Sequence, residues 1–340
     1  MTEYPLPLQK GDLVGVTSPS SGVSAEYELQ LQNAIKQLTH LGYEVKLTNS
    51  VCGNSKLRSS TASIRAKEFI HLYNDKKVKA IIPSGGGEFL MEILPFINFN
   101  ELKEPKWILG YSDISTLLLP YTLNTGFASV SGPVFMDFGN NPLHESLINA
   151  LKVLGLSKGK QFTQHSFGLF QNERLNFKDS ELPYLNLTED VVWKSLQEKE
   201  DLKFEGRIIG GCMDTICKLI GTRFLPIKDF IEKYKREGVI WYFDSCDMNA
   251  ADIYRTLWQM NYNGWFQYCN GILIGRPEGY SDVDDFTLID ALIDSLRDLN
   301  VPVIFNVDIG HKPPQMSIIN GCYSKVEFNQ GKGLVKQILI

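Results

Sequence analysis

The sequence is poor in the features that mark secreted and membrane-spanning proteins. Six of its 340 residues are cysteine and no two of them form a C-x-x-C pair, so we expect reduced, unpaired thiols. The first residues, MTEYPLPLQKGD, contain neither a basic nor an apolar signal region. No apolar run approaches the 18 residues or so that a membrane span requires. We therefore expect a cytoplasmic protein that has no membrane partner.

Histidine and positive charge are scarce as well. The chain has five histidines and no H-E-x-x-H or comparable ligand spacing, so we expect no catalytic metal and no other cofactor. The net charge of −5 disfavours a nucleic-acid partner. The glycine patterns of dinucleotide sites and P-loops are absent too. A metal-free enzyme and a small-molecule-binding protein remain.

Strands and helices alternate in the first half of the chain. Apolar strand segments are followed by amphipathic or apolar helical segments, with the strands expected near 12–16, 43–48, 78–84 and 107–110. This alternation predicts an α/β domain, in which a parallel sheet carries helices on both of its faces.

The second half of the chain has a different pattern. From Gly206 the segments GRIIGG, GVIWYFDS, NGILIGR and VPVIFNVDIG read as strands, and SIINGCYSKVEF reads as a hairpin that turns on Asn320 and Gly321. Helices are expected only near 249–260 and 284–299, which predicts a β-rich α+β domain. Since 340 residues exceed one ordinary core, we divide the chain into an N-terminal domain (1–160), a linker and active-site loop (161–204) and a C-terminal domain (205–340).

Ser112 is the first candidate for chemistry. In KWILGYSDISTLLLP (106–120) a strand stops at Gly110 and a helix begins at once, as in the sharp turn that lifts a nucleophilic hydroxyl clear of the backbone. The segment lacks the second glycine of G-x-S-x-G. An N-cap role for Ser112 or Asp113 is the alternative.

A glycine run lies at the end of the preceding strand. In PSGGGEFL (83–90) three consecutive glycines leave backbone N–H groups unshielded, which suits an oxyanion or a phosphate. Parallel strands would bring this turn to the same sheet edge as Ser112. A tight turn without a ligand is the alternative.

A nucleophilic serine needs a base and a group that orients the base. His311 ends an apolar strand and is followed by Lys-Pro-Pro, whereas the other histidines lie in helices or in irregular sequence. Asp244 ends the strand GVIWYFDS, and Asp247 is the reserve candidate. Either aspartate could instead cap the helix that begins near Asn249.

These segments resemble one family, the serine LD-carboxypeptidases, which includes the microcin C self-immunity hydrolases. The resemblance extends over nearly the whole chain, through GDLVGVTSPSSG, IIPSGGGEFLMEILPFINF, WILGYSDISTLL, GRIIGGCMDTICKLIGT, WYFDSCDMNAADIYRTLWQM and VPVIFNVDIGHKPPQMSIINGC. It implies a flavodoxin-like N-terminal sheet, a β-rich C-terminal domain and a homodimer. It also implies that Ser112 is the nucleophile, His311 the base and Asp244 the acid.

The sequence departs from the family pattern at four positions. Asp244 stands where relatives usually have Glu, so either the backbone must lie closer to His311 or Asp247 takes this role. Cys212 stands where many relatives have Asn. Ser84 and Gly87 replace an arginine and an aromatic residue that are frequent in the glycine turn.

The resemblance implies hydrolysis of the amide bond between an L-centre and a C-terminal D-amino acid, as in murein peptides. We expect the N–H groups of Gly86 and Asp113 to hold the oxyanion. One alternative is an immunity-type amidase that cleaves a peptide-nucleotide or aminoacyl-nucleotide, with Trp193 stacking on the base; Trp193 could equally anchor the core. Another is a non-enzymatic module that binds a nucleotide or a sugar.

Overall fold

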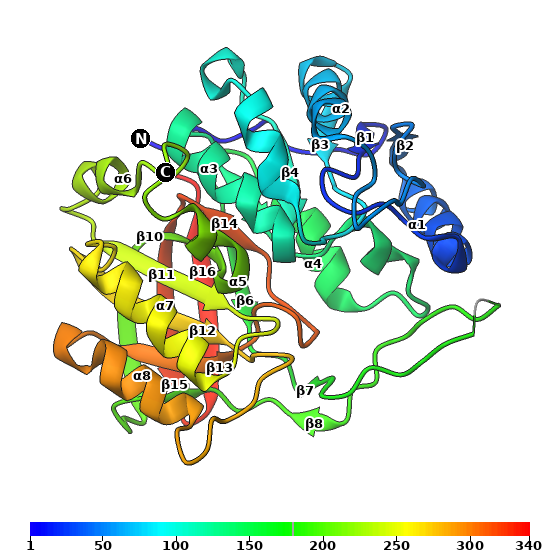
Figure 1. The fold of residues 1–340 in the computed structure, drawn as a ribbon. Coiled ribbons are helices and arrows are strands. Elements are labelled where there is room, and N and C mark those ends of the chain that lie inside the picture. Colours follow the sequence, from blue (N-terminus) through cyan, green and yellow to red (C-terminus); the bar gives the residue numbers. More distant parts are fainter. Residues whose placement is uncertain (179) are drawn as a thin grey trace.

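The described residues contain two large β-sheets that lie side by side (Figure 1) and a third sheet of two short strands. The computed structural model describes residues 1–178 and 180–340. The first sheet has six strands in the order β14-β5-β4-β3-β1-β2. Its five N-terminal strands are parallel, β1 (Leu13–Val16), β2 (Glu44–Leu47), β3 (Val78–Ile81), β4 (Trp107–Gly110) and β5 (Ser129–Ser131). The order 2-1-3-4-5 is that of flavodoxin-like folds, which confirms the predicted N-terminal architecture.

Helices cover both faces of this sheet. In β4, Trp107 and Leu109 belong to one apolar cluster and Ile108 to the other, because successive side chains of a strand point to opposite faces. Helices α1 (Glu28–His40) and α4 (Glu145–Leu154) pack on the first cluster, and α2 (Ala62–Asn74) and α3 (Ser115–Thr125) pack on the second. Short 3-10 helices lie between them, at Ala25–Tyr27, Leu90–Phe96, Phe99–Glu101, Ser112–Ile114 and Phe135–Gly139.

The second sheet has eight strands in the order β6-β16-β15-β10-β11-β12-β13-β9. They are β6 (Gln161–His165), β9 (Lys194–Ser195), β10 (Asp201–Cys212), β11 (Val239–Asp244), β12 (Cys269–Gly275), β13 (Val303–Val307), β15 (Tyr323–Asn329) and β16 (Lys332–Ile338). The sheet is mixed, and β10 to β13 are parallel. Helices α7 (Ala250–Tyr262) and α8 (Leu288–Leu296) connect the last three of these, while α5 (Met213–Ile216), α6 (Ile227–Lys233) and two 3-10 helices (Cys217–Leu219 and Arg297–Leu299) complete the second half.

The hairpin predicted around Asn320 and Gly321 is wrong. Strand β14 (Ile318–Asn320) pairs with β5 of the first sheet, and β15 pairs with β10 and β16 of the second. Asn320 is buried and joins the two sheets: its side chain accepts from Gly210 N–H (3.2 Å) and the Tyr242 hydroxyl (2.9 Å) and donates to Ser129 Oγ (3.2 Å). The Asn-Gly turn therefore carries the chain from one sheet to the other, because buried side-chain hydrogen bonds outweigh the local preference for a hairpin.

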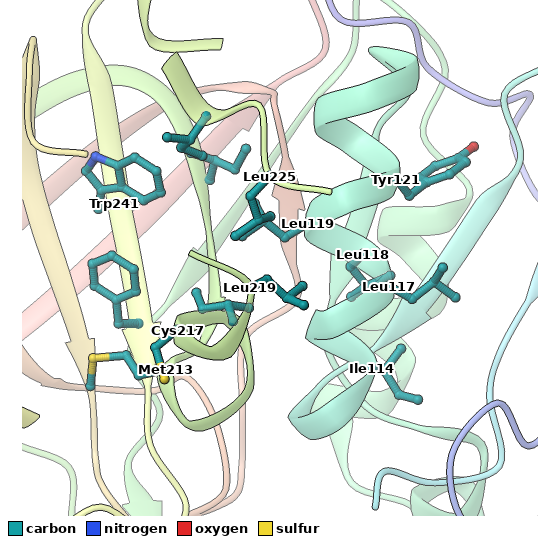
Figure 2. Packing of buried hydrophobic residues seen from close by; sticks show 14 of the residues in the cluster. Ile114, Leu117, Leu118, Leu119, Tyr121, Met213, Cys217, Leu219, Leu225 and Trp241 are labelled. Carbon is teal, nitrogen blue, oxygen red and sulfur yellow. The ribbon is translucent and has the colours of Figure 1, made fainter. Parts of the chain in front are cut away.

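An apolar core joins the two halves and holds them in place. Figure 2 shows Leu117 and Leu118 of α3, on one side, and Trp241 of β11, on the other, with Leu219 and Leu225 between them. All five side chains are buried. Burial of a leucine side chain stabilises by about 2 kcal/mol, so the halves are held in one relative position. No described helix has the length and apolarity needed to cross a membrane.

The segment 161–204 is attached to the second sheet at both ends. Strands β6 and β9 belong to that sheet, and between them β7 (Leu169–Phe170) pairs with β8 (Glu189–Asp190). The described residues between β7 and β8, 171–178 and 180–188, extend from the second half of the molecule as a long loop (Figure 1). The three-part domain division remains a prediction.

Candidate active site

Ser112 lies at a strained turn between β4 and α3. Its φ is +61°, in the left-handed region, which costs a residue other than glycine about 1–3 kcal/mol. A Cβ on Gly110 would lie 2.8 Å from Ile114 Cγ2, so the chain can turn this sharply only with glycine at position 110. Ser112 makes no capping bond to the helix. The N-cap alternative for Ser112 is therefore wrong.

Gly86 lies directly against this turn. A Cβ placed on Gly86 would be 2.9 Å from Ser112 Oγ and 3.5 Å from the backbone nitrogen of Asp113. Only glycine leaves space above the hydroxyl, where an oxyanion could form. The predicted oxyanion residues, Gly86 and Asp113, thus flank the predicted nucleophile.

The Asp113 carboxylate connects three segments around Ser112. It accepts from the Ser20 hydroxyl (2.6 Å), the Leu90 N–H (2.8 Å) and the Thr116 hydroxyl (3.1 Å). Burial raises the pKa of this carboxyl, and the three hydrogen bonds oppose the rise. Asp113 therefore holds the glycine turn and the loop after β1 against the start of α3.

His311 and Asp244 form a buried pair at the carboxyl end of β11 in the second sheet. Nδ1–H of His311 donates to Asp244 Oδ2 at 2.7 Å, and the two residues are 4% and 1% exposed. Burial disfavours the charged imidazole, but the hydrogen bonds and charges of Asp244 and Cys246 outweigh burial and raise the pKa of His311 to about 10. Asp247, by contrast, is exposed, and its N–H donates to Asp214 Oδ1. The structure thus brings Asp244, and not Asp247, to His311.

Two glycines explain how the short side chain of Asp244 reaches His311. A Cβ on Gly310 would lie 2.4 Å from Asp244 Cβ, and one on Gly275 would lie 3.2 Å from the same atom. Because neither position has a side chain, the backbone on both sides lies closer to Asp244. This close approach makes up for the methylene group by which Asp is shorter than Glu.

Tyr111 connects the two halves of the site. It directly precedes Ser112, and its ring centroid lies 5.0 Å from that of the His311 imidazole. The base therefore stands beside the nucleophile turn. Nε2 of His311 is buried and has no hydrogen-bond partner among residues 1–178 and 180–340, so no described group competes with the substrate or the Ser112 hydroxyl for this nitrogen.

A cleft of about 390 Å³ opens next to these residues. Tyr111 and Gly310 line the cleft, and residues between Gln171 and Lys178 and between Glu181 and Leu185 form much of its wall. Arg174 lies in this wall; its Nε donates to Glu278 Oε1 at 2.8 Å, and its Nη2 donates to the His311 carbonyl at 3.4 Å. Sequence reasoning missed Arg174, because it stands in an irregular stretch with no motif around it.

Asp137 also lines the cleft. Burial raises the pKa of its carboxyl from 3.8 to about 6. A carboxyl with a raised folded pKa stabilises the fold fully below its unfolded pKa, and this contribution is lost as the pH rises through about 6. The maximum effect is about 3 kcal/mol, at about 1.4 kcal/mol per pH unit, and contact with the open cleft reduces it.

We therefore expect Asp137→Asn to be more stable than the unmodified protein at pH 7.5 and to lose this advantage near pH 4. The asparagine oxygen can still accept from the Val134 N–H, which Asp137 binds at 3.0 Å. Thermal unfolding midpoints of both proteins, measured from pH 4 to pH 7.5, show whether the stability difference changes with pH in this direction. A constant difference between the two midpoints would contradict it.

Both halves of the chain match one protein family. The LD-carboxypeptidase N-terminal domain matches residues 14–132, and the LD-carboxypeptidase C-terminal domain matches residues 205–326. The chain belongs to the LD-carboxypeptidase family. It is a hydrolase of the serine-peptidase type, as the sequence predicted.

Relatives of this LD-carboxypeptidase family member carry two kinds of name. A putative carboxypeptidase of Vibrio cholerae is 28% identical over 96% of this chain and 95% of its own length. The microcin C7 self-immunity protein MccF of Escherichia coli is 24% identical over 98% and 96%. Among solved structures, MccF in complex with glutamyl sulfamoyl guanosine has a TM-score of 0.84 at 22% identity, with 98% of both chains covered. That structural likeness shows the shared fold.

Trp193 does not line the cleft of this family member, so the prediction that it stacks on a substrate base is wrong. Its side chain is 1% exposed, and its indole N–H donates to Asp308 Oδ2 at 3.0 Å. Asp308 also forms a buried ion pair with Arg276 (2.7 Å). Trp193 therefore anchors the loop to the core and cannot stack on a substrate.

The other three residues that depart from the family pattern are each compatible with their surroundings in the structure. Ser84 is buried and shares a 2.5 Å hydrogen bond with Ser18. Gly87 has a φ of +144°, and a Cβ there would lie 2.4 Å from the hydroxyl oxygens of Ser20 and Ser21. Cys212 pairs with Asp244 in the β10–β11 register and is 1% exposed. Burial, together with the nearby carboxylates of Asp244 and Asp214, raises the pKa of its thiol.

Proposed function

We propose that this protein hydrolyses an amide bond through a Ser112–His311–Asp244 triad without a metal ion. The hydrogen bond from His311 to Asp244, next to the strained turn of Ser112, is the observation that carries the proposal. Nε2 of His311 takes the Ser112 proton as Oγ attacks the carbonyl carbon, and it then gives the proton to the leaving amine. Water, deprotonated by the same nitrogen, hydrolyses the acyl-enzyme.

Asp244 and the glycine turn supply the electrostatics of this reaction. The Asp244 carboxylate keeps the proton on Nδ1 and stabilises the imidazolium that forms at Nε2. The N–H groups of Gly86 and Asp113 hold the oxyanion, and each such donor contributes about 3 kcal/mol to transition-state stabilisation. The proposed reaction needs no electron transfer and no cofactor.

The turn at Gly86 provides a direct test of the oxyanion assignment. We expect Gly86→Ala to lower kcat by about 10²–10³-fold, because its Cβ would occupy the space next to Ser112 Oγ. Gly85→Ala is the matched control, since a Cβ on Gly85 would meet nothing within 4 Å. Steady-state kinetics of both variants give the comparison, and equal losses would contradict the assignment.

The proposed substrate is a murein-type peptide cleaved between an L-centre and a C-terminal D-amino acid. Two points support it: a Bacillus subtilis relative, 26% identical, is named a probable murein peptide carboxypeptidase, and Arg174 supplies a cation for the terminal carboxylate. Its ion pair with Glu278 is largely exposed on the arginine side, so breaking this pair costs less than about 1 kcal/mol.

We expect Arg174→Ala to raise KM about tenfold to a hundredfold with little change in kcat, since a hydrogen bond to a charged group is worth about 1.5–3 kcal/mol. A substrate whose terminal carboxylate is amidated should not respond to the substitution. Lys178→Ala, which removes another cation of the cleft wall, is the control. If Lys178→Ala alone raises KM, the anchor is Lys178.

A second candidate substrate is an aminoacyl- or peptidyl-nucleotide. MccF has been solved with glutamyl sulfamoyl guanosine and with aspartyl sulfamoyl adenosine. In this chain Phe177 and Tyr184 line the cleft with ring centroids 5.0 Å apart. This aromatic pair could stack on a base, the role that was expected of Trp193. Membership of a hydrolase family disfavours the non-enzymatic binding module.

A competition experiment separates the two substrates. Equal amounts of a muropeptide that ends in D-alanine and an aminoacyl-sulfamoyl adenosine are incubated with the protein and followed by mass spectrometry. We expect cleavage of the muropeptide. Cleavage of the nucleoside compound alone would contradict the proposed murein substrate but would not contradict the proposed triad. The homodimer and the cytoplasmic location remain predictions.

A further inference from the structure

Three buried side chains meet at the carboxyl ends of β10 and β11. Cys212, Asp244 and His311 each offer one metal-ligating atom, and these atoms all lie within 4.8 Å of one another. The residues are 1%, 1% and 4% exposed. In addition, Asp244 Oδ1 is buried and has no hydrogen-bond partner among the described residues. The proposed triad uses only the other oxygen of Asp244 and makes no use of Cys212.

We propose that Cys212, Asp244 and His311 form an inhibitory binding site for a thiophilic divalent cation, best matched by Zn²⁺. A thiolate, a carboxylate and an imidazole are the ligand types that zinc prefers, at about 2.0–2.3 Å from the ion. Tetrahedral ligands at these distances lie about 3.5 Å apart. The present spacing therefore needs only a small shift of side chains to enclose the ion.

The ion would take the place of one proton. Zn–S, Zn–N and Zn–O bonds form, the thiol proton of Cys212 goes to solvent, and the proton of His311 moves from Nδ1 to Nε2, so that a neutral imidazole binds the ion. The hydrogen bond between His311 and Asp244 is broken, and no oxidation is involved. Because Nε2 of the zinc-bound imidazole already carries a proton, it cannot accept the proton of Ser112, and the site would switch off hydrolysis. This consequence, unlike the binding itself, rests on the proposed function.

The hydrogen bonds around Cys212 allow its thiol to leave Asp214 and bind the ion. Its thiol donates to Asp214 Oδ2 (3.5 Å), a weak bond because S–H is a weak donor, and the same oxygen accepts the N–H of Cys246 at 3.0 Å. Asp214 thus keeps its backbone partner when the thiol leaves. Cys246 is half-buried and follows Asp244 by two residues, so either its thiol or water is available as a fourth ligand.

Metal binding is tested first without any activity measurement. The reduced, chelator-treated full-length protein is titrated with Co²⁺, which should bind at one equivalent with a thiolate-to-metal charge-transfer absorption, and Zn²⁺ should displace it. Cys212→Ser should lack this absorption and bind Zn²⁺ at least about tenfold more weakly, since losing even an outer-sphere partner of a metal costs this much. His311→Ala should weaken Zn²⁺ binding in the same way.

Cys217→Ser is the matched control. Cys217 is also buried, and its thiol donates to the Asp214 carbonyl, but it is not part of the cluster. This variant should keep the absorption. Absence of the band from the unmodified protein, or a band that survives in Cys212→Ser, would overturn the site.

Hydrolysis is measured in parallel as the ratio of rates with and without equimolar Zn²⁺. We expect at least a tenfold loss in the unmodified protein and in Cys217→Ser, reversed by a chelator, and a smaller loss in Cys212→Ser. If the Cys212-dependent band forms but activity persists, the metal site stands and His311 is not the base. If the band is absent while Ser112 and His311 remain essential, the triad stands and the metal site does not.

Discussion

The Ser112→Ala variant should lose amide hydrolysis by about 10⁴-fold or more while it remains folded. Without Oγ no acyl-enzyme can form, and only substrate binding and oxyanion stabilisation remain, which explains why triad deletions leave a small residual rate. Alanine has the same Cβ as serine and keeps the turn. The comparison of kcat/KM for the two proteins, with circular dichroism as a check of folding, gives the result.

A glycine at position 112 separates two effects, the loss of the hydroxyl and the backbone strain of this turn. Ser112→Gly should be equally inactive but more stable than Ser112→Ala by about 1 kcal/mol or more, because glycine adopts the φ of +61° freely. Ser157→Ala, outside the site, should retain full activity. If Ser112→Ala keeps more than a tenth of the activity, Ser112 is not the nucleophile.

Asp244→Asn should lower kcat by about 10⁴-fold, the loss expected when the acid of such a triad becomes an amide. An asparagine can hold His311 in the wrong tautomer, with the proton on Nε2 instead of Nδ1. That nitrogen then cannot accept the proton of Ser112. Steady-state kinetics at saturating substrate measure this loss.

The matched control is Asp247→Asn, because Asp247 is exposed and the substitution keeps its backbone N–H, which donates to Asp214 Oδ1. It should change kcat less than twofold. Asp244→Glu is also informative: relatives usually carry Glu, but Gly310 and Gly275 press against Asp244, so the longer side chain should reduce activity here. A large loss in Asp247→Asn with full activity in Asp244→Asn would reverse the assignment.

Part of the site could be predicted because its residues stand at ends of regular elements. The strand that stops at Gly110, the helix that follows and the glycine run before it are local patterns, and the parallel sheet then brings both turns to one edge. His311 and Asp244 were found in the same way, as polar residues at the ends of apolar strands. The choice between Asp244 and Asp247 needed the structure, because both are three residues or less from the same strand end.

The sequence by itself determined the alternation of strands and helices and the two turns around Ser112, and its resemblance to a known family implied the flavodoxin-like sheet. These are local properties, since side-chain periodicity and glycine conformation depend on neighbours in the chain. Only the tertiary structure decided the partner of His311, the burial of Trp193, the place of Arg174 in the cleft and the passage of the Asn320 turn between two sheets. Each of these depends on contacts between residues far apart in sequence, where burial and hydrogen bonding outweigh local preference.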